Sequence, residues 1–323
     1  MMDSVELCAG AGGQALGLEL AGFSHRAAVE IDEACQATLR HNRPHWNVQS
    51  GIQADVTQFD AAAYKGIDLL AGGLPCPPFS VAGHQLGEKD ERNLFPHAIR
   101  IIDECKPKAV MIENVRGFLD PVFSDYREFL RHQFSRLGYH VDWRLFNASD
   151  FGVSQLRPRV VIVAVRNTLK DRFTWPKRHE TPPQDVGSLL RDLMAADGWQ
   201  GADAWARHAK GIAPTLVGGS KKHGGPDLGP TRARKAWELL GVDGKGVVDC
   251  PPSPDFSGMP RLTVRMAARI QGFPDDWHFV GRKTAAYRQV GNAFPPPVAK
   301  AVGHSLSLAL GAGHADEKWV VNG

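Results

Sequence analysis

The sequence lacks the features of membrane and of secreted, disulfide-bonded proteins. Its longest apolar runs, such as residues 160–165, fall far short of the roughly 20 residues that cross a bilayer. Residues 1–4 show no basic region followed by an apolar stretch, so we expect no secretion signal and no membrane partner. The five cysteines have no paired spacing, which favours a reducing cytoplasm over a disulfide framework. Without a C-x-x-C pair or a His/Cys cluster, no metal site is predicted.

The composition is that of an ordinary globular protein, and its charge is unevenly distributed. The chain has 323 residues, enough for two domains or for one large domain with an insertion. The net charge of +3 is too small to indicate a partner. Residues 204–245, however, hold eight Lys and Arg against three Asp and Glu, an excess larger than that of the whole chain. This stretch has two interpretations, a phosphate-binding surface or a solvated face.

The first regular elements predict a ligand-binding turn. A strand at residues 4–8 runs into a glycine turn at residues 9–13 and then a helix near residues 16–21, the first unit of a doubly wound α/β sheet. Glycines let a ligand approach the backbone, and the helix N-terminus offers unpaired N–H groups. Glu30 ends the next strand, about twenty residues later, where an acid commonly holds a ribose hydroxyl. A tight turn followed by an exposed acid is the alternative.

Cys76 stands on a stiff turn after a buried strand predicted at residues 67–71. It lies in the sequence Gly72-Gly73-Leu74-Pro75-Cys76-Pro77-Pro78-Phe79-Ser80, and proline restricts both its own φ and the residue before it. A thiol held this rigidly indicates a nucleophile. The loop at residues 81–93 is rich in glycine and charge, and it is long enough to be an active-site lid.

Charged residues also mark the ends of later strands. Glu113 ends an apolar strand at residues 108–112, at the sheet edge where parallel sheets bind ligands. Arg157 and Arg159 are one residue apart in an extended segment, so their side chains are predicted to point the same way and to suit an anion or a base carbonyl. Pairing with surface acids is the alternative for both.

The remaining pattern predicts a helical return after a loop-rich insert. Further helices are expected at residues 33–42, 94–104 and 123–137, and strands at 141–147 and 159–165, with a third strand ending near residues 54–57. From about residue 175 to 260, glycine and proline clusters leave room for two helices, at 186–196 and 231–240. A helix at residues 262–272, capped by Thr263, and a closing helix at residues 295–310 follow.

Five motifs in this order resemble the C5-cytosine DNA methyltransferases of bacterial restriction–modification systems. The motifs are Glu6 to Gly13, Pro75 to Ser80, Glu113-Asn114-Val115, Gln155 to Arg159 and Arg288 to Ala293. The resemblance covers about residues 3–166 and 261–309 and leaves out the insert. It implies a mostly parallel, doubly wound sheet of the S-adenosylmethionine-dependent methyltransferase fold. It also implies a smaller, loop-rich target-recognition domain.

The resemblance implies domains and catalytic roles. Residues 1–174 would form the catalytic and cofactor-binding domain, 175–262 the target-recognition domain, 263–311 the return to the catalytic domain, and 312–323 a flexible tail. Cys76 would add to C6 of a flipped-out cytosine, and Glu113 would hold N3 and the exocyclic amine. Arg157 and Arg159 would hold the base carbonyl and neighbouring groups.

The resemblance also implies the ligands. The cofactor would be S-adenosyl-L-methionine, leaving S-adenosyl-L-homocysteine as product, with Leu7, Cys8, Ala9, Gly10, Gly12, Gly13, Glu30, Ile31, Asp55, Val56, Pro75, Asn292 and Ala293 as its binding residues. Double-stranded DNA would be the partner of a monomeric cytoplasmic enzyme. The residues expected to contact DNA are Ser80, Gln85, Arg92, Thr215, Lys221, Lys222, Arg232 and Arg234. A cognate restriction endonuclease would act on the same site without direct contact.

Two departures from the family pattern and two alternatives stand beside this interpretation. Cys8 replaces a phenylalanine that stacks on the cofactor in the family, and Pro77 replaces a common glutamine. Of the two cysteines in these motifs, Cys76 is favoured over Cys8 as the nucleophile. An RNA methyltransferase acting on tRNA cytosine is the main alternative, although the basic insert favours DNA. A non-catalytic nucleic-acid-binding homologue is the other, and the intact set of Cys76, Glu113 and the two arginines argues against it.

Overall fold

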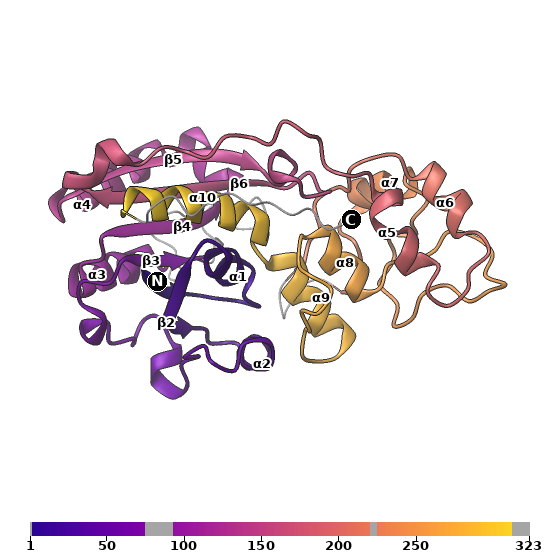
Figure 1. Cartoon of the computed structure of the whole chain (residues 1–323), viewed down its shortest axis with the longest axis horizontal. Coiled ribbons are helices and arrows are strands. Elements are labelled where there is room, and N and C mark those ends of the chain that lie inside the picture. The colour runs from indigo at the N-terminus through magenta and orange to yellow at the C-terminus, as the bar shows by residue number, and fades with distance from the viewer. Residues whose placement is uncertain (1, 75–92, 220–224, 312–323) are drawn as a thin grey trace.

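One six-stranded sheet organises the chain. The computed structural model describes residues 2–74, 93–219 and 225–311, so the predicted tail at 312–323 lies outside the described residues. Its strand order is β2-β1-β3-β4-β6-β5 (Figure 1). Strands β1 to β4 pair in parallel, and β6 runs antiparallel to β4 and β5, which confirms an α/β fold with a mostly parallel sheet. The bounds are β1 (Met2–Leu7), β2 (Phe23–Val29), β3 (Leu69–Gly72), β4 (Ala109–Val115), β5 (Tyr139–Asn147) and β6 (Pro158–Arg166).

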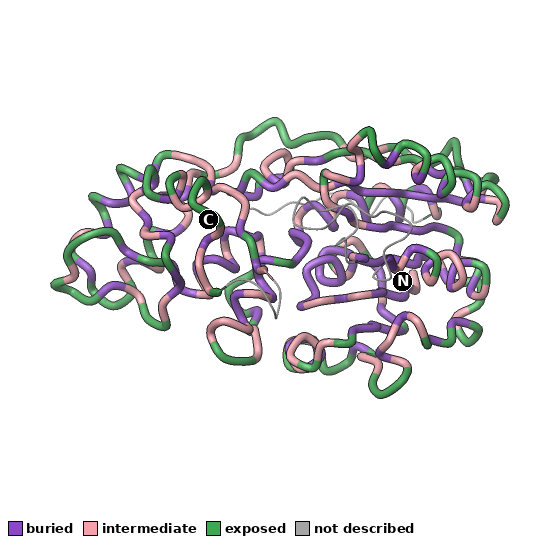
Figure 2. Tube along the Cα trace, turned by 180° about the vertical axis from the view of Figure 1, so that it is seen from behind, coloured by how far each residue is buried: buried purple, intermediate pink, exposed green. Residues whose placement is uncertain are grey.

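Helices cover both faces of this sheet. On β4, Val110 and Ile112 pack in one core cluster with α3 (Phe95–Cys105) and α4 (Ser124–Arg136). Met111, between them, packs on the opposite face with α10 (Pro296–Ala309), which also contacts α1 (Gly13–Leu20). Because successive side chains of a strand point to opposite faces, a strand covered on both sides is apolar throughout. Figure 2 shows the buried positions gathered along the strands.

The insert carries three described helices, α5 (Val186–Met194), α6 (Ala202–His208) and α7 (Thr231–Glu238). The sequence predicted two of them, and the seven-residue α6 was missed. The chain then continues through α8 (Val264–Ile270) and α9 (Lys283–Asn292). The Thr263 side chain caps the N-terminus of α8, as predicted. Residues of the insert share one core cluster with α8, α9 and the first glycine turn. The domain boundary near residue 262 therefore crosses a continuous core and stays a prediction.

The third strand expected near residues 54–57 is wrong. The segment forms a 3₁₀ turn over Gly51–Ala54, and the Asp55 carboxylate then accepts a hydrogen bond from the backbone N–H of Thr57 at 2.9 Å. An aspartate that bonds the backbone two residues on stabilises a turn in place of an extended strand.

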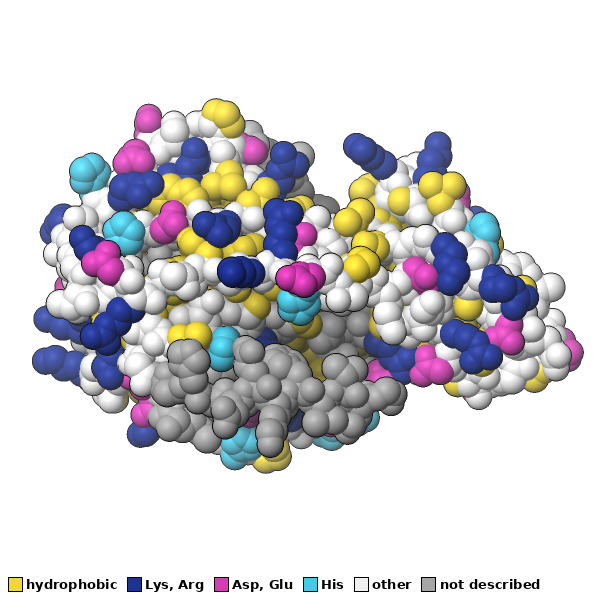
Figure 3. All heavy atoms as spheres, turned by 45° about the horizontal axis from the view of Figure 1, so that its top comes forward, with side chains coloured by type: hydrophobic (Ala, Val, Ile, Leu, Met, Phe, Trp, Pro, Cys, Tyr) yellow, Lys and Arg dark blue, Asp and Glu magenta, His cyan; other side chains and the backbone are white. Residues whose placement is uncertain are grey.

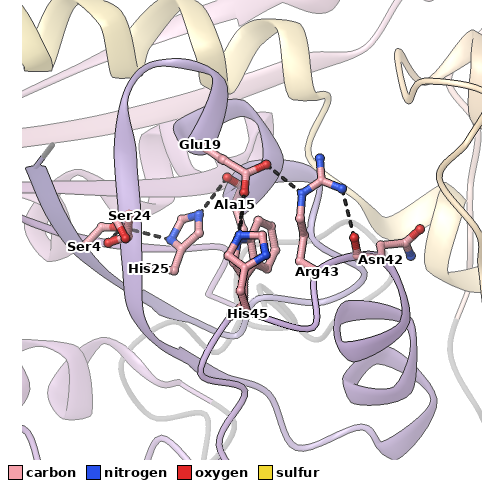
Figure 4. Close-up of polar contacts among 9 residues, drawn as sticks. Ser4, Ala15, Glu19, Ser24, His25, Asn42, Arg43 and His45 are labelled. Carbon is pink, nitrogen blue, oxygen red and sulfur yellow. Dashed lines mark hydrogen bonds and ion pairs between the residues drawn. The ribbon is translucent and has the colours of Figure 1, made fainter.

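A polar network fixes α1 on the edge of the sheet (Figure 4). His25 on β2 lies 2.9 Å from the Ser4 hydroxyl on β1, and its other ring nitrogen lies 2.8 Å from the carbonyl oxygen of Ala15. One turn later, the Glu19 carboxylate accepts a hydrogen bond from Arg43 at 2.7 Å. Because α1 is held at both ends, the glycine turn before it has a fixed position.

No helix in the described residues is long and apolar enough to cross a membrane.

Candidate active site

A cavity of about 690 Å³ lies at the carboxyl ends of β1, β2, β3 and β4. This is the sheet edge at which open parallel sheets bind ligands, and the volume is typical of a small-molecule site. The segment around the end of α9 forms the opposite wall. Among the residues predicted to bind the cofactor, those lining the cavity are Cys8, Ala9, Gly10, Gly13, Glu30, Ile31, Asn292 and Ala293.

The glycine turn forms one side of the cavity, and its residue types follow from its geometry. Gly12, at φ 89°, has a backbone conformation that residues with a side chain rarely adopt. Gly13 lies so close to the opposite wall that a Cβ atom there would be 2.2 Å from the carbonyl oxygen of Phe294. Any side chain at this position would therefore push the two walls of the cavity apart.

Glu30 is a buried acidic residue that lines the cavity. Its carboxylate accepts hydrogen bonds from the backbone N–H of Gly10 at 2.7 Å and of Asp32 at 2.8 Å. Burial raises the pKa of Glu30 above the usual value for a glutamate. Each carboxylate oxygen can accept a second hydrogen bond, so the side chain can still take the hydroxyl groups of a ribose. The residues present thus fit the sugar of an adenosyl cofactor.

Other residues predicted to bind the cofactor do not line the cavity. Leu7 and Val56 pack in the core on the α3 side of the sheet, and Asp55 is held by its own turn. Gly12 faces away from the cavity, because a Cβ atom there would be 2.8 Å from Leu39 and from Trp277. Pro75 lies outside the described residues.

Glu113 and Arg159 form a nearly buried ion pair beside the cavity. The Arg159 Nε atom lies 2.7 Å from Glu113 Oε1, and the two side chains are 16% and 13% exposed. Glu113 lines the cavity together with Gly73, which follows the neighbouring strand β3. The structure thus brings the predicted activating carboxylate to the cavity wall that the glycine turn also forms. The predicted nucleophile, Cys76, lies outside the described residues.

Arg157 does not share the orientation of Arg159, and the expectation that both arginines hold the base is wrong for Arg157. Arg157 is 1% exposed, and its guanidinium donates hydrogen bonds to the carbonyl oxygens of Leu216 at 2.8 Å, Gly291 at 2.9 Å and Ala293 at 3.0 Å. Burial, followed by the charge of Arg159, lowers the pKa of Arg157. Its role is to join β6, the insert and the end of α9. The extended pattern predicted parallel side chains because it carried no information on the segments that cover the strand.

An Arg157→Met variant is expected to lower the free energy of unfolding by about 2 kcal/mol. Three buried carbonyl oxygens would lose their donor, and relief of the buried charge would offset part of that cost. Urea unfolding followed by circular dichroism measures the change. The matched control is Arg144→Met on the exposed side of β5, which should stay within about 0.5 kcal/mol of the unchanged protein. Equal stabilities of the two variants would contradict the joining role of Arg157.

Few of the predicted DNA contacts can be placed. Arg232 and Arg234 lie on α7, with Arg232 exposed, and Figure 3 shows Lys and Arg side chains spread over the surface of this part of the molecule. The Thr215 hydroxyl donates a hydrogen bond to the carbonyl oxygen of Leu156, so it joins the insert to the segment just before β6. The other predicted contacts lie outside the described residues: Ser80, Gln85, Arg92, Lys221 and Lys222.

Sequence reasoning missed several lining residues. Arg288 lines the cavity and belongs to the motif at residues 288–293, so that motif could have indicated it. Gln14 directly follows the double glycine. Cys35 also lines the cavity, in the first turn of α2 (Glu33–Asn42), which the Asp32 side chain caps and whose bounds are as predicted. Among the described residues, no group of three or more His, Cys, Asp or Glu could hold a metal ion.

Comparison with solved structures supports the fold. The chain superposes on a mutant of the Spodoptera frugiperda DNMT2 protein with a TM-score of 0.65, over 95% of this chain and 99% of that one, at 19% identity. For the S. pombe Dnmt2 methyltransferase the TM-score is 0.62 at 16% identity, over 96% of this chain and 98% of that one. At such identities the likeness concerns the fold alone.

Sequence relatives and the family model identify the family. The chain is 56% identical to the type II methyltransferase M.NgoMIV of Neisseria gonorrhoeae, over 95% of this chain and 97% of the relative. It is also 56% identical to the type II methyltransferase M.NaeI of Lentzea aerocolonigenes, over 96% and 75% of the two chains. The model of the C-5 cytosine-specific DNA methylases matches residues 2–308. The chain belongs to this family and is a DNA (cytosine-5-)-methyltransferase.

Proposed function

We propose that this enzyme methylates C5 of one flipped-out cytosine within a specific sequence of double-stranded DNA, as the methylase of a restriction–modification system. The observation that carries the proposal is the Glu113–Arg159 ion pair at the wall of a cavity that the glycine turn and Glu30 also line. This arrangement supports a cytosine held by Glu113 beside a cofactor held by the glycine turn and Glu30. The proposed cofactor is S-adenosyl-L-methionine, whose sulfonium supplies the methyl group.

The chain's own residues perform the activation of the base. The Cys76 thiolate adds to C6 of the cytosine, which moves electron density to C5. Glu113 hydrogen-bonds N3 and the exocyclic amine, and Arg159 fixes the carboxylate in place. Once C5 carries the methyl group, a base removes the proton from C5, the C5–C6 double bond re-forms, and the bond between sulfur and C6 breaks to release the thiolate. Cytosine must leave the helix stack first, at a cost of a few kcal/mol.

The system and its partners follow from the relatives and the surface charge. Relatives at 56% identity carry the name type II methyltransferase, which supports a role beside a cognate restriction endonuclease that acts on the same site without direct contact. The exposed basic side chains of α7 support a DNA-binding target-recognition domain. We further propose that the enzyme is a monomer and acts in the bacterial cytoplasm or nucleoid.

Methyl transfer from labelled cofactor to duplex DNA and to tRNA tests the substrate class. Label is expected in DNA, and label in tRNA alone would overturn the proposal in favour of an RNA methyltransferase. Bisulfite sequencing of DNA from a host that expresses the protein then reports the target sequence and the modified base. Methylation spread over all cytosines without a common sequence would contradict the role in a restriction–modification system.

Replacing Arg232 with alanine is expected to reduce the slope of log K against log salt for DNA binding by about 1. Arg232 is exposed on α7, and one phosphate contact releases about one counterion. Binding titrations at several salt concentrations measure the slope. Arg136→Ala, at the exposed end of α4, is the control and should leave it unchanged. Replacing Lys221 and Lys222 together should reduce the slope by about 2, because two contacts would be lost. A slope equal to that of the unchanged enzyme would assign the replaced residue to a solvated face.

A further inference from the structure

Arg288 is a half-buried cation at the cavity wall that the proposed function has not used. It lies on α9 and lines the cavity together with Glu113 and Asn292. Its guanidinium forms no ion pair and no hydrogen bond with any of the residues that the structure describes. Partial burial takes a charged group out of water at a cost, and a partner of opposite charge offsets that cost. An arginine without such a partner at a cavity wall therefore points to an anionic ligand.

The acidic residues that line the same cavity have other roles. Glu113 is held in its ion pair, and Glu30 accepts hydrogen bonds from two backbone N–H groups. The Asp32 side chain caps α2, and Glu33 is exposed in the first turn of that helix, where the helix end favours its negative charge. The described acids of the cavity thus leave the charge of Arg288 to a group from outside the chain.

The position of Arg288 is at the border between the cavity and the insert, since α9 lies between the sheet and the insert (Figure 1). Asn292, one turn later on α9, donates a hydrogen bond to the carbonyl oxygen of Gly219 in the insert at 3.1 Å. A Cβ atom at Gly218 would lie 2.5 Å from the carbonyl oxygen of Arg288, so the backbone of the insert rests directly on this turn of α9. Residues four apart share one face of a helix, and Arg288 therefore lies on the face that meets the insert.

This border is where a flipped-out nucleotide would bring its phosphates. A base that leaves the duplex turns about its own backbone, so the phosphates on either side of it stay near the line that the base crosses. A guanidinium group can form two parallel hydrogen bonds with one phosphate, and it keeps its charge at any physiological pH. Charge, geometry and position thus agree on a phosphate as the ligand.

We propose that Arg288 binds one of the two phosphates that flank the target cytosine and thereby holds the flipped-out nucleotide in the cavity. This inference rests on the proposed function, which places duplex DNA against the insert and the cytosine beside Glu113. The contact acts on the position of the base, whereas Glu113 acts on its chemistry.

Duplexes with a single neutral phosphate test the assignment. Binding titrations compare duplexes that carry one uncharged methylphosphonate at the phosphate 5′ or 3′ of the target cytosine, once bisulfite sequencing has located it. One of the two replacements is expected to weaken binding by the unchanged enzyme about tenfold or more, because hydrogen bonds to charged groups are strong. Arg288→Met should bind the unmodified duplex more weakly by a similar factor and should lose nothing further from that replacement. Two changes that remove one and the same contact do not add.

The matched control is Arg282→Met, because Arg282 directly precedes α9, is exposed and does not line the cavity. It should lose as much affinity from the neutral phosphate as the unchanged enzyme does. If Arg288→Met does not fold, Arg288→Gln also removes the charge and serves in its place. Calorimetric titration without DNA should show the same affinity for S-adenosyl-L-methionine in Arg288→Met and in the unchanged enzyme.

Three results would overturn the inference. The first is an unchanged enzyme that tolerates both neutral phosphates, and the second is a full additional loss in Arg288→Met at each position. The third is a weaker affinity of Arg288→Met for the methyl donor alone, which would assign the side chain to that ligand. If the unchanged enzyme did not bind duplex DNA at all, the proposed function itself would be wrong, and this inference with it.

Discussion

A Cys76→Ser variant is expected to transfer no measurable methyl group to DNA while keeping the donor affinity of the unchanged enzyme. A serine hydroxyl is almost entirely protonated at neutral pH, whereas a cysteine is partly a thiolate and is intrinsically the better nucleophile. Without addition to C6, C5 of cytosine stays too electron-poor to accept a methyl group. Labelled methyl transfer and calorimetric donor binding measure the two quantities separately.

The covalent step has a direct readout once bisulfite sequencing has located the target. In a duplex with fluorine at C5 of that cytosine, methyl transfer leaves no proton for C5 to lose, so the bond between sulfur and C6 persists. The unchanged enzyme should then migrate with the DNA on a denaturing gel, and Cys76→Ser should not. Cys250→Ser, at an exposed position, is the control that should still form the adduct. An adduct formed by Cys76→Ser would falsify the assignment of the nucleophile.

Glu113→Gln is expected to slow methyl transfer by about 10²- to 10⁴-fold. Glutamine keeps the size of the side chain and can accept a hydrogen bond from the exocyclic amine. Unlike a carboxyl group, however, it cannot transfer a proton to N3 of the cytosine. It also gives up the charge that pairs with Arg159 at 2.7 Å. Single-turnover rates with enzyme in excess over DNA isolate the chemical step from product release.

The control for this variant is Glu128→Gln on α4, whose side chain is 60% exposed and forms a surface ion pair with Arg131. It should leave the rate unchanged. Donor affinity should be retained in Glu113→Gln, since the residue proposed to hold the ribose is Glu30. A rate for Glu113→Gln within a factor of about three of the unchanged enzyme would remove Glu113 from the activation of the base.

The sequence predicted the parts of the site that strand ends determine. Glu30 and Glu113 each lie where an apolar run stops, and in a parallel sheet such ends meet at one edge. The glycine turn could be predicted for a different reason: a cluster of glycines directly indicates a tight backbone turn. These local signals were enough to predict that Glu30, Glu113 and the glycine turn lie at the same edge of the sheet.

What the sequence did not reveal depends on contacts between distant segments. Arg157 bonds carbonyl groups 59 to 136 residues away, and no local pattern could predict that its side chain turns from the site. The short α6 gave too few turns for an apolar period, and near residue 55 a side-chain bond outweighed the strand-like composition. The lack of an ionic partner for Arg288 among the described residues is likewise visible only in three dimensions.

The pairing of α1 with α10 has a consequence for synthesis of the chain. The cavity is lined by Gly73, by Glu113 and by residues from the segment 8–35, with residues from the segment 285–294 on the opposite wall, and α10 packs against α1 (Figure 1). A chain still on the ribosome therefore has its glycine turn and its strands, but the wall formed by residues 285–294 and one cover of the sheet are missing until about residue 309 has emerged. Methylating activity should thus appear only after α10 has been made, and translation products that end before α10 should be unable to modify DNA.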